Sequence, residues 1–357
     1  MNSAEIVNML KARGKDQEAL FALARRTRAQ WFGDSAFLRG VVEISNVCKQ
    51  NCFYCGMRRD NRQMTRYQMR PAEVFECARE MKAAGINILF LQAGECDGTT
   101  EIVEEVCPQV KNELQMTVIA CIGNRTRKQF ERLVKAGIDG YILKHETSDE
   151  SLHFKLRSMD LKERLRCVRT LTSLGIKVGG GNIIGLPGQT LESIAEDILL
   201  AKKLGVSYAS ASPFIPHEVS PLAGEPCGDP HLTLNTMAVL QLCLNVPVPT
   251  VSALDLLMDH GQETGFHAGA NVVTCNFTPE RFRVRYSLYS QKRPNKSLKD
   301  LVAMIHGAGL KVVNDGYAVK PGRPPHSARR PAQTISIRPR ARQHREDAAS
   351  LATRGNR

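Results

Sequence analysis

Long apolar runs are missing from this sequence: no stretch of about twenty apolar residues, the length that a membrane-spanning helix requires, occurs in it. The N-terminus also lacks the apolar core of a secretory signal. We therefore expect a cytoplasmic protein with no membrane partner. Composition excludes disorder throughout, because 42% of the 357 residues are hydrophobic and 24% are charged, as is typical of a globular protein.

Acidic residues are too few to balance the basic ones: 36 Asp and Glu stand against 49 Lys and Arg, a formal charge of +13. The excess is concentrated in residues 318–357, which hold ten basic and two acidic residues and so carry +8. This tail is rich in Pro and Arg and has no apolar periodicity, which predicts disorder. An arginine-rich arm for RNA or an acidic partner is the alternative. We expect a solvated appendage and no nucleic-acid partner.

Eleven cysteines in a chain without an export signal do not indicate a disulfide framework, because the cytosol keeps thiols reduced. Three of them, Cys48, Cys52 and Cys55, have the spacing CxxxCxxC, for which chance predicts about 0.01 occurrences. Three thiolates suit a 4Fe-4S cluster and leave its fourth iron without a protein ligand, hence open to a small molecule. The alternative is a zinc knuckle, which needs a fourth Cys or His. The 20 residues after Cys55 contain neither.

Short apolar runs alternate with helical ones along most of the chain. The expected strands are 40–45, 87–93, 116–121, 140–144, 176–184, 207–213, 247–252 and 270–275. The expected helices between them are 71–84, 100–113, 127–136, 161–174, 191–204 and 232–244. This order predicts an α/β fold, a closed or nearly closed (βα)8 barrel of the TIM type. We expect N-terminal helices in 1–36, the barrel in 37–317 and the tail in 318–357.

The cysteine spacing, with Tyr54 before the third cysteine, resembles the signature of the radical S-adenosylmethionine (SAM) enzymes. The resemblance implies a 4Fe-4S cluster on Cys48, Cys52 and Cys55, whose free iron binds the amino and carboxylate groups of SAM. It also implies reductive cleavage of SAM to a 5'-deoxyadenosyl radical that acts on a small-molecule substrate. The implied protein partner is a reductant such as flavodoxin or ferredoxin.

Other segments extend the resemblance to the SAM contacts. Gly94 and Glu95 resemble the motif that holds the SAM ammonium, where glycine permits close backbone approach and a carboxylate pairs with the amine. An ordinary strand-to-helix turn with a solvated Glu is the alternative there. Glu146 would hydrogen-bond the SAM ribose and Arg164 would pair with the SAM carboxylate. For Glu146 the alternative is a structural salt bridge.

Taken in order from 37 to 310, the chain resembles the subgroup that contains biotin synthase, methylornithine synthase and HydE, the maturase of [FeFe]-hydrogenase. The local matches in 58–61, 145–147 and 213–217 favour a HydE-like enzyme. Lys144 stands where that maturase has an arginine, and Lys cannot reproduce a planar two-pronged contact. A methylornithine-synthase-like mutase and a biotin-synthase-like sulfur insertion are the alternatives. For the latter, Cys121 falls near one cluster-ligand position, but the glycines of 179–181 stand where that enzyme has another cysteine.

Candidate substrate contacts are polar residues at strand ends and in the C-terminal loops: Asp97, Ser252, Asp255 and Tyr286. Each is equally compatible with an ordinary cap or loop hydrogen bond. A non-enzymatic alternative is a redox or RNA-binding protein with a structural cluster, which would require a fourth protein ligand.

Overall fold

The computed structural model describes residues 1–290 and 294–313. Within them, parallel strands form one curled sheet in the order β6-β5-β4-β3-β2-β1-β7. A further strand, β8, pairs with the first three residues of β1. The strands are β1 (Ser35–Ser45), β2 (Ile88–Ala93), β3 (Thr117–Cys121), β4 (Gly140–Ile142), β5 (Lys177–Ile184), β6 (Tyr208–Pro213), β7 (Val272–Asn276) and β8 (Lys311–Val313). The tail 318–357, predicted to be disordered, lies outside the described residues.

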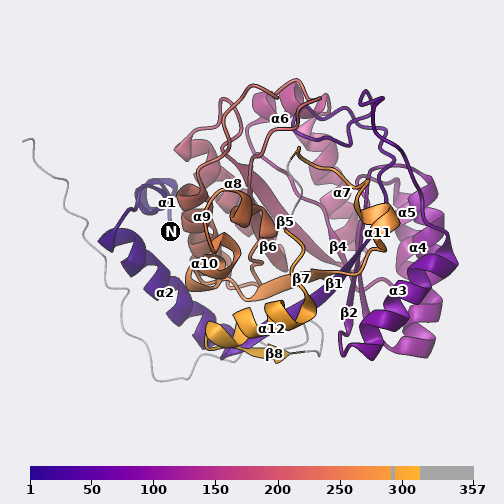
Figure 1. Cartoon of the computed structure of the whole chain (residues 1–357). Coiled ribbons are helices and arrows are strands. Elements are labelled where there is room, and N and C mark those ends of the chain that lie inside the picture. Colours follow the sequence, from indigo (N-terminus) through magenta and orange to yellow (C-terminus); the bar gives the residue numbers. More distant parts are fainter. Residues whose placement is uncertain (291–293, 314–357) are drawn as a thin grey trace, which may run out of the picture. The chain divides into compact units, whose positions relative to one another are not determined.

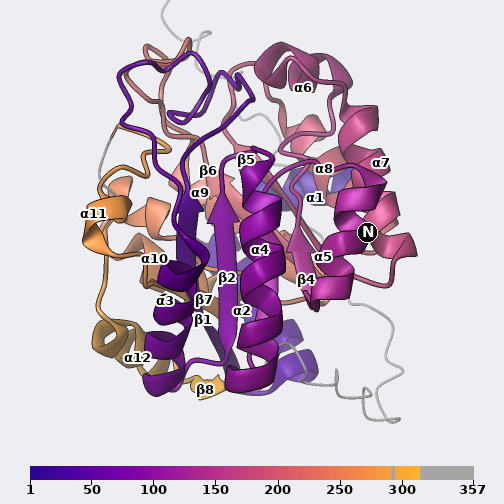
Figure 2. The ribbon, with the colours of Figure 1, turned by 90° about the vertical axis from the view of Figure 1, so that its right-hand side faces the viewer.

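Most of the helices lie on the outer face of this sheet, and α6 lies at its upper end among the loops (Figure 1). The helices are α1 (Ser3–Leu10), α2 (Lys15–Phe32), α3 (Pro71–Ala83), α4 (Gly98–Gln109), α5 (Arg127–Ala136), α6 (Glu150–Arg157), α7 (Leu161–Ser173), α8 (Leu191–Lys203), α9 (Pro230–Leu244), α10 (Gly261–His267), α11 (Glu280–Arg283) and α12 (Leu298–Gly307). Figure 2 shows α3 and α4 side by side over the sheet, with β2 visible between them. The fold is thus α/β with a curled parallel sheet. None of the helices in the described ranges is both long and apolar enough to cross a membrane.

The gap between the edge strands β6 and β7 is spanned by residues 247–250. The Ala209 N–H donates to the Pro247 carbonyl (3.2 Å) and the Thr250 N–H donates to the Val272 carbonyl (2.9 Å). The sequence predicts a strand over 247–252, but the structure forms only an isolated bridge at Pro249. Pro247 and Pro249 explain the difference, because proline has no N–H to donate to a strand ladder.

Helices α1 and α2 cover the outside of this gap, beside α8, α9 and α10 (Figure 1). Ile6 and Leu10 of α1 are fully buried there. Arg28 of α2 is also buried, and its guanidinium donates to the carbonyls of Phe266 and Ala270 (3.1 Å each) at the end of α10. These bonds tie α2 to the last turn of α10 and to the segment that follows it. The N-terminal segment is therefore packed into the same body as the sheet.

Alternation along β1 decides which side chains enter the interior of the curled sheet. Successive residues of a strand point to opposite faces. Leu38 and Val42 pack toward the outer helices, whereas Phe37 and Val41 belong to the inner apolar cluster. Arg39 lies between those two inner residues in register, and it lines the internal cavity. The alternation of side chains along β1 therefore places the Arg39 guanidinium in the interior of the sheet.

Candidate active site

A cavity of about 380 Å³ lies inside the curled sheet, at the carboxyl ends of the strands. Its lining comes from several strands, from the cysteine loop, and from the segments after β6 and β7. In parallel α/β folds this end of the sheet is where the loops that carry reactive groups meet. Cys48, Cys52 and Cys55 all line it.

The cysteine loop is tied to three other parts of the chain. The Phe53 N–H donates to the Leu156 carbonyl of α6 (2.8 Å), and the Gly56 N–H donates to the Leu288 carbonyl (2.8 Å). The Glu95 N–H points at the Cys48 sulfur (3.4 Å). Gly56 must remain a glycine, since a Cβ there would lie 2.1 Å from the His217 ring. These contacts with α6, the segment around Leu288 and the segment after β2 fix the position of the cysteine loop.

Burial around these thiols disfavours their free ionised form. Burial raises the pKa of Cys48 and of Cys55, and the neighbouring Cys52 raises both further. Binding to iron displaces the thiol proton, so a buried, crowded set of thiols fits a metal cluster better than it fits a free nucleophile. In residues 1–290 and 294–313 no three His, Cys, Asp or Glu side chains are placed to share a single metal ion. A cubane does not need that arrangement, because each thiolate binds a different iron.

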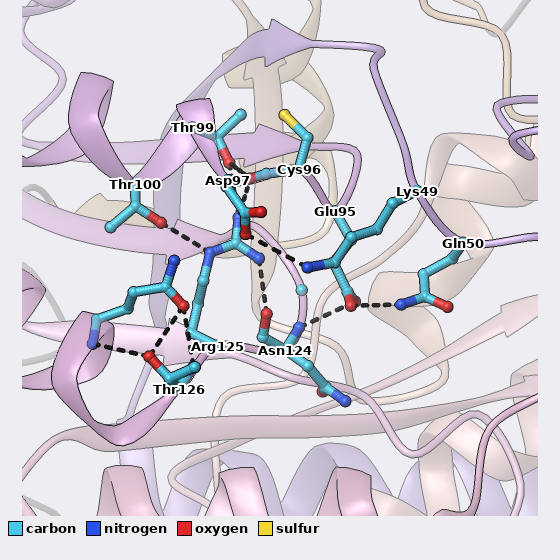
Figure 3. Close-up of polar contacts among 12 residues, drawn as sticks. Lys49, Gln50, Glu95, Cys96, Asp97, Thr99, Thr100, Asn124, Arg125 and Thr126 are labelled. Atoms are coloured by element: carbon cyan, nitrogen blue, oxygen red, sulfur yellow. Dashed lines mark hydrogen bonds and ion pairs between the residues drawn. The ribbon is translucent and has the colours of Figure 1, made fainter.

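Gly94 and Glu95 follow β2, and Glu95 lies beside Lys49 and Gln50 of the cysteine loop (Figure 3). A Cβ on Gly94 would lie 2.3 Å from the Val47 carbonyl oxygen, so only glycine fits between the two segments. Glu95 is 5% exposed. Its Oε1 accepts from the Gln50 amide (2.6 Å) and its Oε2 from the Asn124 N–H (2.9 Å). The alternative of a solvated Glu in an ordinary turn is therefore wrong.

Glu146 and Arg164 lie in the same cavity lining as Glu95. Arg164 is buried and its Nη2 lies 4.0 Å from Glu95 Oε2. Glu146 Oε1 lies 3.8 Å from Nη1 of Arg157. Glu146 Oε2 is buried and has no hydrogen-bond partner among the described residues. Polar side chains from four separate segments therefore surround the space next to the cysteine loop.

Arg157, at the end of α6, is a central member of this group that the sequence did not single out. Its Nη1 donates to the Tyr54 hydroxyl (2.9 Å) as well as approaching Glu146. Burial lowers the pKa of Arg157, but Tyr54, Cys52 and the two glutamates outweigh it and raise that pKa. The spacing of Leu152 and Leu156 does not identify Arg157, because it lies about 100° round the helix from Leu156. Residues 150–157 were not among the expected helices.

The four candidate substrate contacts do not lie together. Ser252 and Tyr286 line the cavity, whereas Asp97 and Asp255 do not. Asp97 is 69% exposed and pairs with Lys49 (3.3 Å). Asp255 pairs with Lys296 and accepts from the Gln262 N–H (2.8 Å). Asp97 follows β2 and Asp255 lies between β6 and β7, as expected, but neither side chain lines the cavity.

Two cations occupy the cavity wall instead. The Arg39 guanidinium lies over the rings of Phe90 (4.4 Å) and Tyr208 (5.0 Å), and its Nε donates to Thr274 Oγ1 (2.8 Å). Lys144 Nζ donates to Ser212 Oγ (3.4 Å). Cys121 also lines this part of the cavity, and burial raises its pKa to about 11. Arg39 and Lys144 therefore add two cationic side chains to the cavity lining.

Two neutral histidines are buried behind Glu146. Burial, followed by the positive charge of neighbours, lowers the pKa of His145 to about 3 and that of His153 to about 4. Neither ring nitrogen of His153 has a hydrogen-bond partner in the described part of the chain. Since the folded pKa of His153 lies below the ordinary value of 6.5, its contribution to stability is present above pH 6.5 and is lost as the pH falls toward 4.

Replacing His153 with leucine is therefore expected to protect the chain against acid. At pH 5 the wild-type histidine destabilises the folded state by about 2 kcal/mol relative to a group that does not titrate. At pH 7.5 the two proteins should differ less than at pH 5, because the imidazole is then largely neutral in both the folded and the unfolded chain. Urea unfolding of the metal-free chain at both pH values measures this, with exposed His306→Leu as the control. An equal effect of His153→Leu at both pH values would rule out this assignment.

Comparisons with known proteins give a consistent result. A family model described as the Radical SAM superfamily matches residues 42–201. The chain is 38% identical over 278 residues to the [FeFe] hydrogenase maturase subunit HydE of Thermotoga maritima, covering 77% of this chain and 80% of that protein. It is 26% identical over 306 residues to the 3-methylornithine synthase of Methanosarcina acetivorans, covering 83% and 85%.

The fold is also that of a solved structure. The crystal structure of methylornithine synthase (PylB) superposes with a TM-score of 0.77 at 24% identity, and the match covers 87% of this chain and 94% of that chain. The likeness supports the α/β architecture with its curled parallel sheet.

Proposed function

Because the chain belongs to the radical SAM superfamily, whose enzymes use a 4Fe-4S cluster and SAM, we propose that Cys48, Cys52 and Cys55 are its cluster ligands. The observation that carries this proposal is the convergence of the three cysteines with Gly94 and Glu95 on one cavity. The protein is a radical SAM enzyme of HydE-like sequence. When bound, the cluster supplies the electron that cleaves the sulfonium of SAM.

The side chains around the loop suit the polar parts of SAM. We assign the SAM ammonium to the Gly94 backbone and the Glu95 carboxylate, because Gln50 and Asn124 hold that carboxylate rigidly. Arg164 is the partner for the SAM carboxylate, and Glu146 Oε2, buried and without a partner among the described residues, is the acceptor for a ribose hydroxyl.

Tyr54 and Arg157 complete the wall by holding Glu146 and the cysteine loop in fixed relation. The Tyr54 hydroxyl accepts from Arg157, which also faces Glu146, so a change in one of the three displaces the others. We further propose that the sheet forms a closed (βα)8 barrel. Residues 247–250 take the place of the eighth strand, between β6 and β7. Closure keeps water away from the cavity, and water would quench reactive intermediates.

The experiment that tests this function is SAM cleavage by the full chain. After anaerobic reconstitution with iron and sulfide, dithionite and SAM should yield 5'-deoxyadenosine and methionine in equal amounts. If the protein holds a complete cluster but forms neither product, the result supports the non-enzymatic alternative.

We propose that the substrate is a small acidic molecule. Arg39 and Lys144 both line the cavity, and a carboxylate or similar anion can accept charge-assisted hydrogen bonds from such side chains. Ser252 and Tyr286 line the same cavity and are our candidates for orienting the rest of the substrate. Asp97 and Asp255 are not retained as substrate contacts. HydE-like chemistry is the first candidate, and methylornithine-synthase-like rearrangement the second, since both relatives match most of the chain.

Replacing both Arg39 and Lys144 with methionine is expected to abolish the response to acidic substrates. Small carboxylates should accelerate 5'-deoxyadenosine formation by the wild type, and the double variant should need about 10 to 100 times more of the same compound. The measurement is a concentration series of each compound on both proteins. Exposed Lys155→Met is the control. If uncharged compounds stimulate the two proteins equally and acids stimulate neither, the cations have another role.

A 4Fe-4S cluster needs an electron donor and a compartment in which thiols stay reduced. We propose a one-electron donor such as flavodoxin or ferredoxin and a cytoplasmic location, where thiols remain reduced and free to bind iron.

A further inference from the structure

Glu146 has a backbone conformation that a glutamate seldom adopts. Its φ is +66°, in the left-handed region, and it is not a glycine. The Thr147 N–H donates to the His145 carbonyl (2.9 Å), so residues 145–147 form a three-residue turn closed across Glu146. The γ-turn with positive φ is the rare, strained form. Such a conformation is unfavourable and persists only where the surroundings impose it.

Strand β5 imposes part of it. The Glu146 N–H donates to the Gly181 carbonyl (3.1 Å) and the Glu146 carbonyl accepts from the Ile183 N–H (3.0 Å). These two bonds make Asn182 the bridge partner of Glu146. They fix the two peptide groups of the turn against the sheet, but they leave the direction of the chain after Thr147 to other contacts.

A carboxylate on an outer helix fixes that direction. Asp197 of α8 is 1% exposed, and its Oδ1 accepts from both the backbone N–H and the hydroxyl (2.6 Å) of Ser148. Its Oδ2 accepts from the Asn182 side-chain amide (3.1 Å). One carboxylate therefore binds the residue that follows the turn and the residue that pairs with Glu146 across the bridge.

Burial of the Asp197 carboxylate is energetically unfavourable, and the other buried side chains around it on α8 make apolar contacts. Its neighbours in α8, Ile194 and Ile198, pack into an apolar cluster. Its own partners are uncharged, and the nearby charge of Asp149 has the same sign. A buried anion without a cation destabilises the fold unless several donors satisfy it. Here all of the donors belong to the two segments that carry and pair with Glu146.

We propose that Asp197 is a positioning residue for SAM: it holds the strained turn at 145–147 and thereby presents the Glu146 carboxylate to the nucleoside part of SAM. This inference rests on the proposed function, because it takes SAM as the molecule that Glu146 meets. Asparagine keeps the size of Asp197 but removes its charge and exchanges one acceptor oxygen for a donor, so it weakens the hold on Ser148 or on Asn182.

The test is a double-mutant cycle on the reconstituted holoenzyme, with the dissociation constant of radiolabelled SAM as the readout. Asp197→Asn should raise that constant by about tenfold when Glu146 is present and by less than about twofold in a Glu146→Gln background. The KM for SAM should rise more than kcat falls. Glu196→Gln, the exposed neighbour on α8, is the control and should change neither.

A merely structural role gives a different pattern. An Asp197→Asn variant that weakens SAM binding equally in both backgrounds, or in neither, overturns the proposal. If Asp197→Asn does not fold, Ser148→Ala carries the same cycle, because it removes the hydroxyl donor but keeps the backbone one; a weakening by about threefold that vanishes with Glu146→Gln supports the proposal, and an equal weakening overturns it. A wild type that loads its cluster yet binds no SAM would instead sink the proposed function.

Discussion

Cys52→Ala is expected to lose 5'-deoxyadenosine formation to the detection limit, a fall of more than about 10³-fold, because the cofactor carries the difficult chemistry. Cys52 is buried between the other two cysteines of the loop, and two thiolates cannot hold a cubane with a single open iron. Iron and sulfide bound per chain and the 5'-deoxyadenosine yield should fall together. Both are measured on the same anaerobic sample.

The matched control is Cys227→Ala, since Cys227 is the exposed cysteine of the described residues. That variant should bind four irons and cleave SAM at the wild-type rate. Normal cleavage by Cys52→Ala would refute the assignment of the ligands. Normal loading with no cleavage would show that Cys52 acts on SAM and not on iron.

The second large effect is expected at Arg157. Arg157→Met leaves Glu146 facing Tyr54 without the cation between them, and removing one partner of a buried ion pair costs about 3–5 kcal/mol. Part of that energy appears as weaker binding of SAM, so kcat/KM for SAM should fall by about 100-fold while iron content stays normal. Steady-state formation of 5'-deoxyadenosine against SAM concentration measures it.

Two variants sharpen the interpretation. Arg157→Lys keeps the charge but loses the planar fork, so its loss should be intermediate. Arg127→Met removes an exposed arginine that pairs within α5 and should have no effect. If Arg157→Met retains full kcat/KM for SAM, the Tyr54–Arg157–Glu146 contacts are structural only.

Local sequence signals predicted most of the sheet. Seven of the eight expected strands coincide with β1 to β7, because buried parallel strands are short, apolar and often β-branched. The segment at 247–252 is apolar in the same way, but its two prolines remove N–H donors. That segment therefore forms one hydrogen bond to β6 and two to β7 without extending into a regular strand. Strand β8 is three residues long, which is too short to leave a periodic signal.

The site was predictable where it depends on contiguous motifs. The cysteine spacing and the Gly94–Glu95 pair are read directly from neighbouring residues, and the structure brings them together. Arg157 and Asp197 depend on contacts with residues that are far away in the sequence, so no local pattern identifies them. Asp97 and Asp255 show the converse: position after a strand indicates the correct end of the fold, but only the fold decides whether a side chain turns inward.

The central claim is that three thiolates leave one iron free for SAM. The most direct measurement is the low-temperature electron paramagnetic resonance spectrum of the dithionite-reduced holoenzyme, recorded before and after addition of SAM at four irons per chain. We predict that SAM changes the spectrum of the reduced cluster and that competition by methionine reverses part of the change. A fully loaded cluster whose spectrum does not respond to SAM would contradict the account.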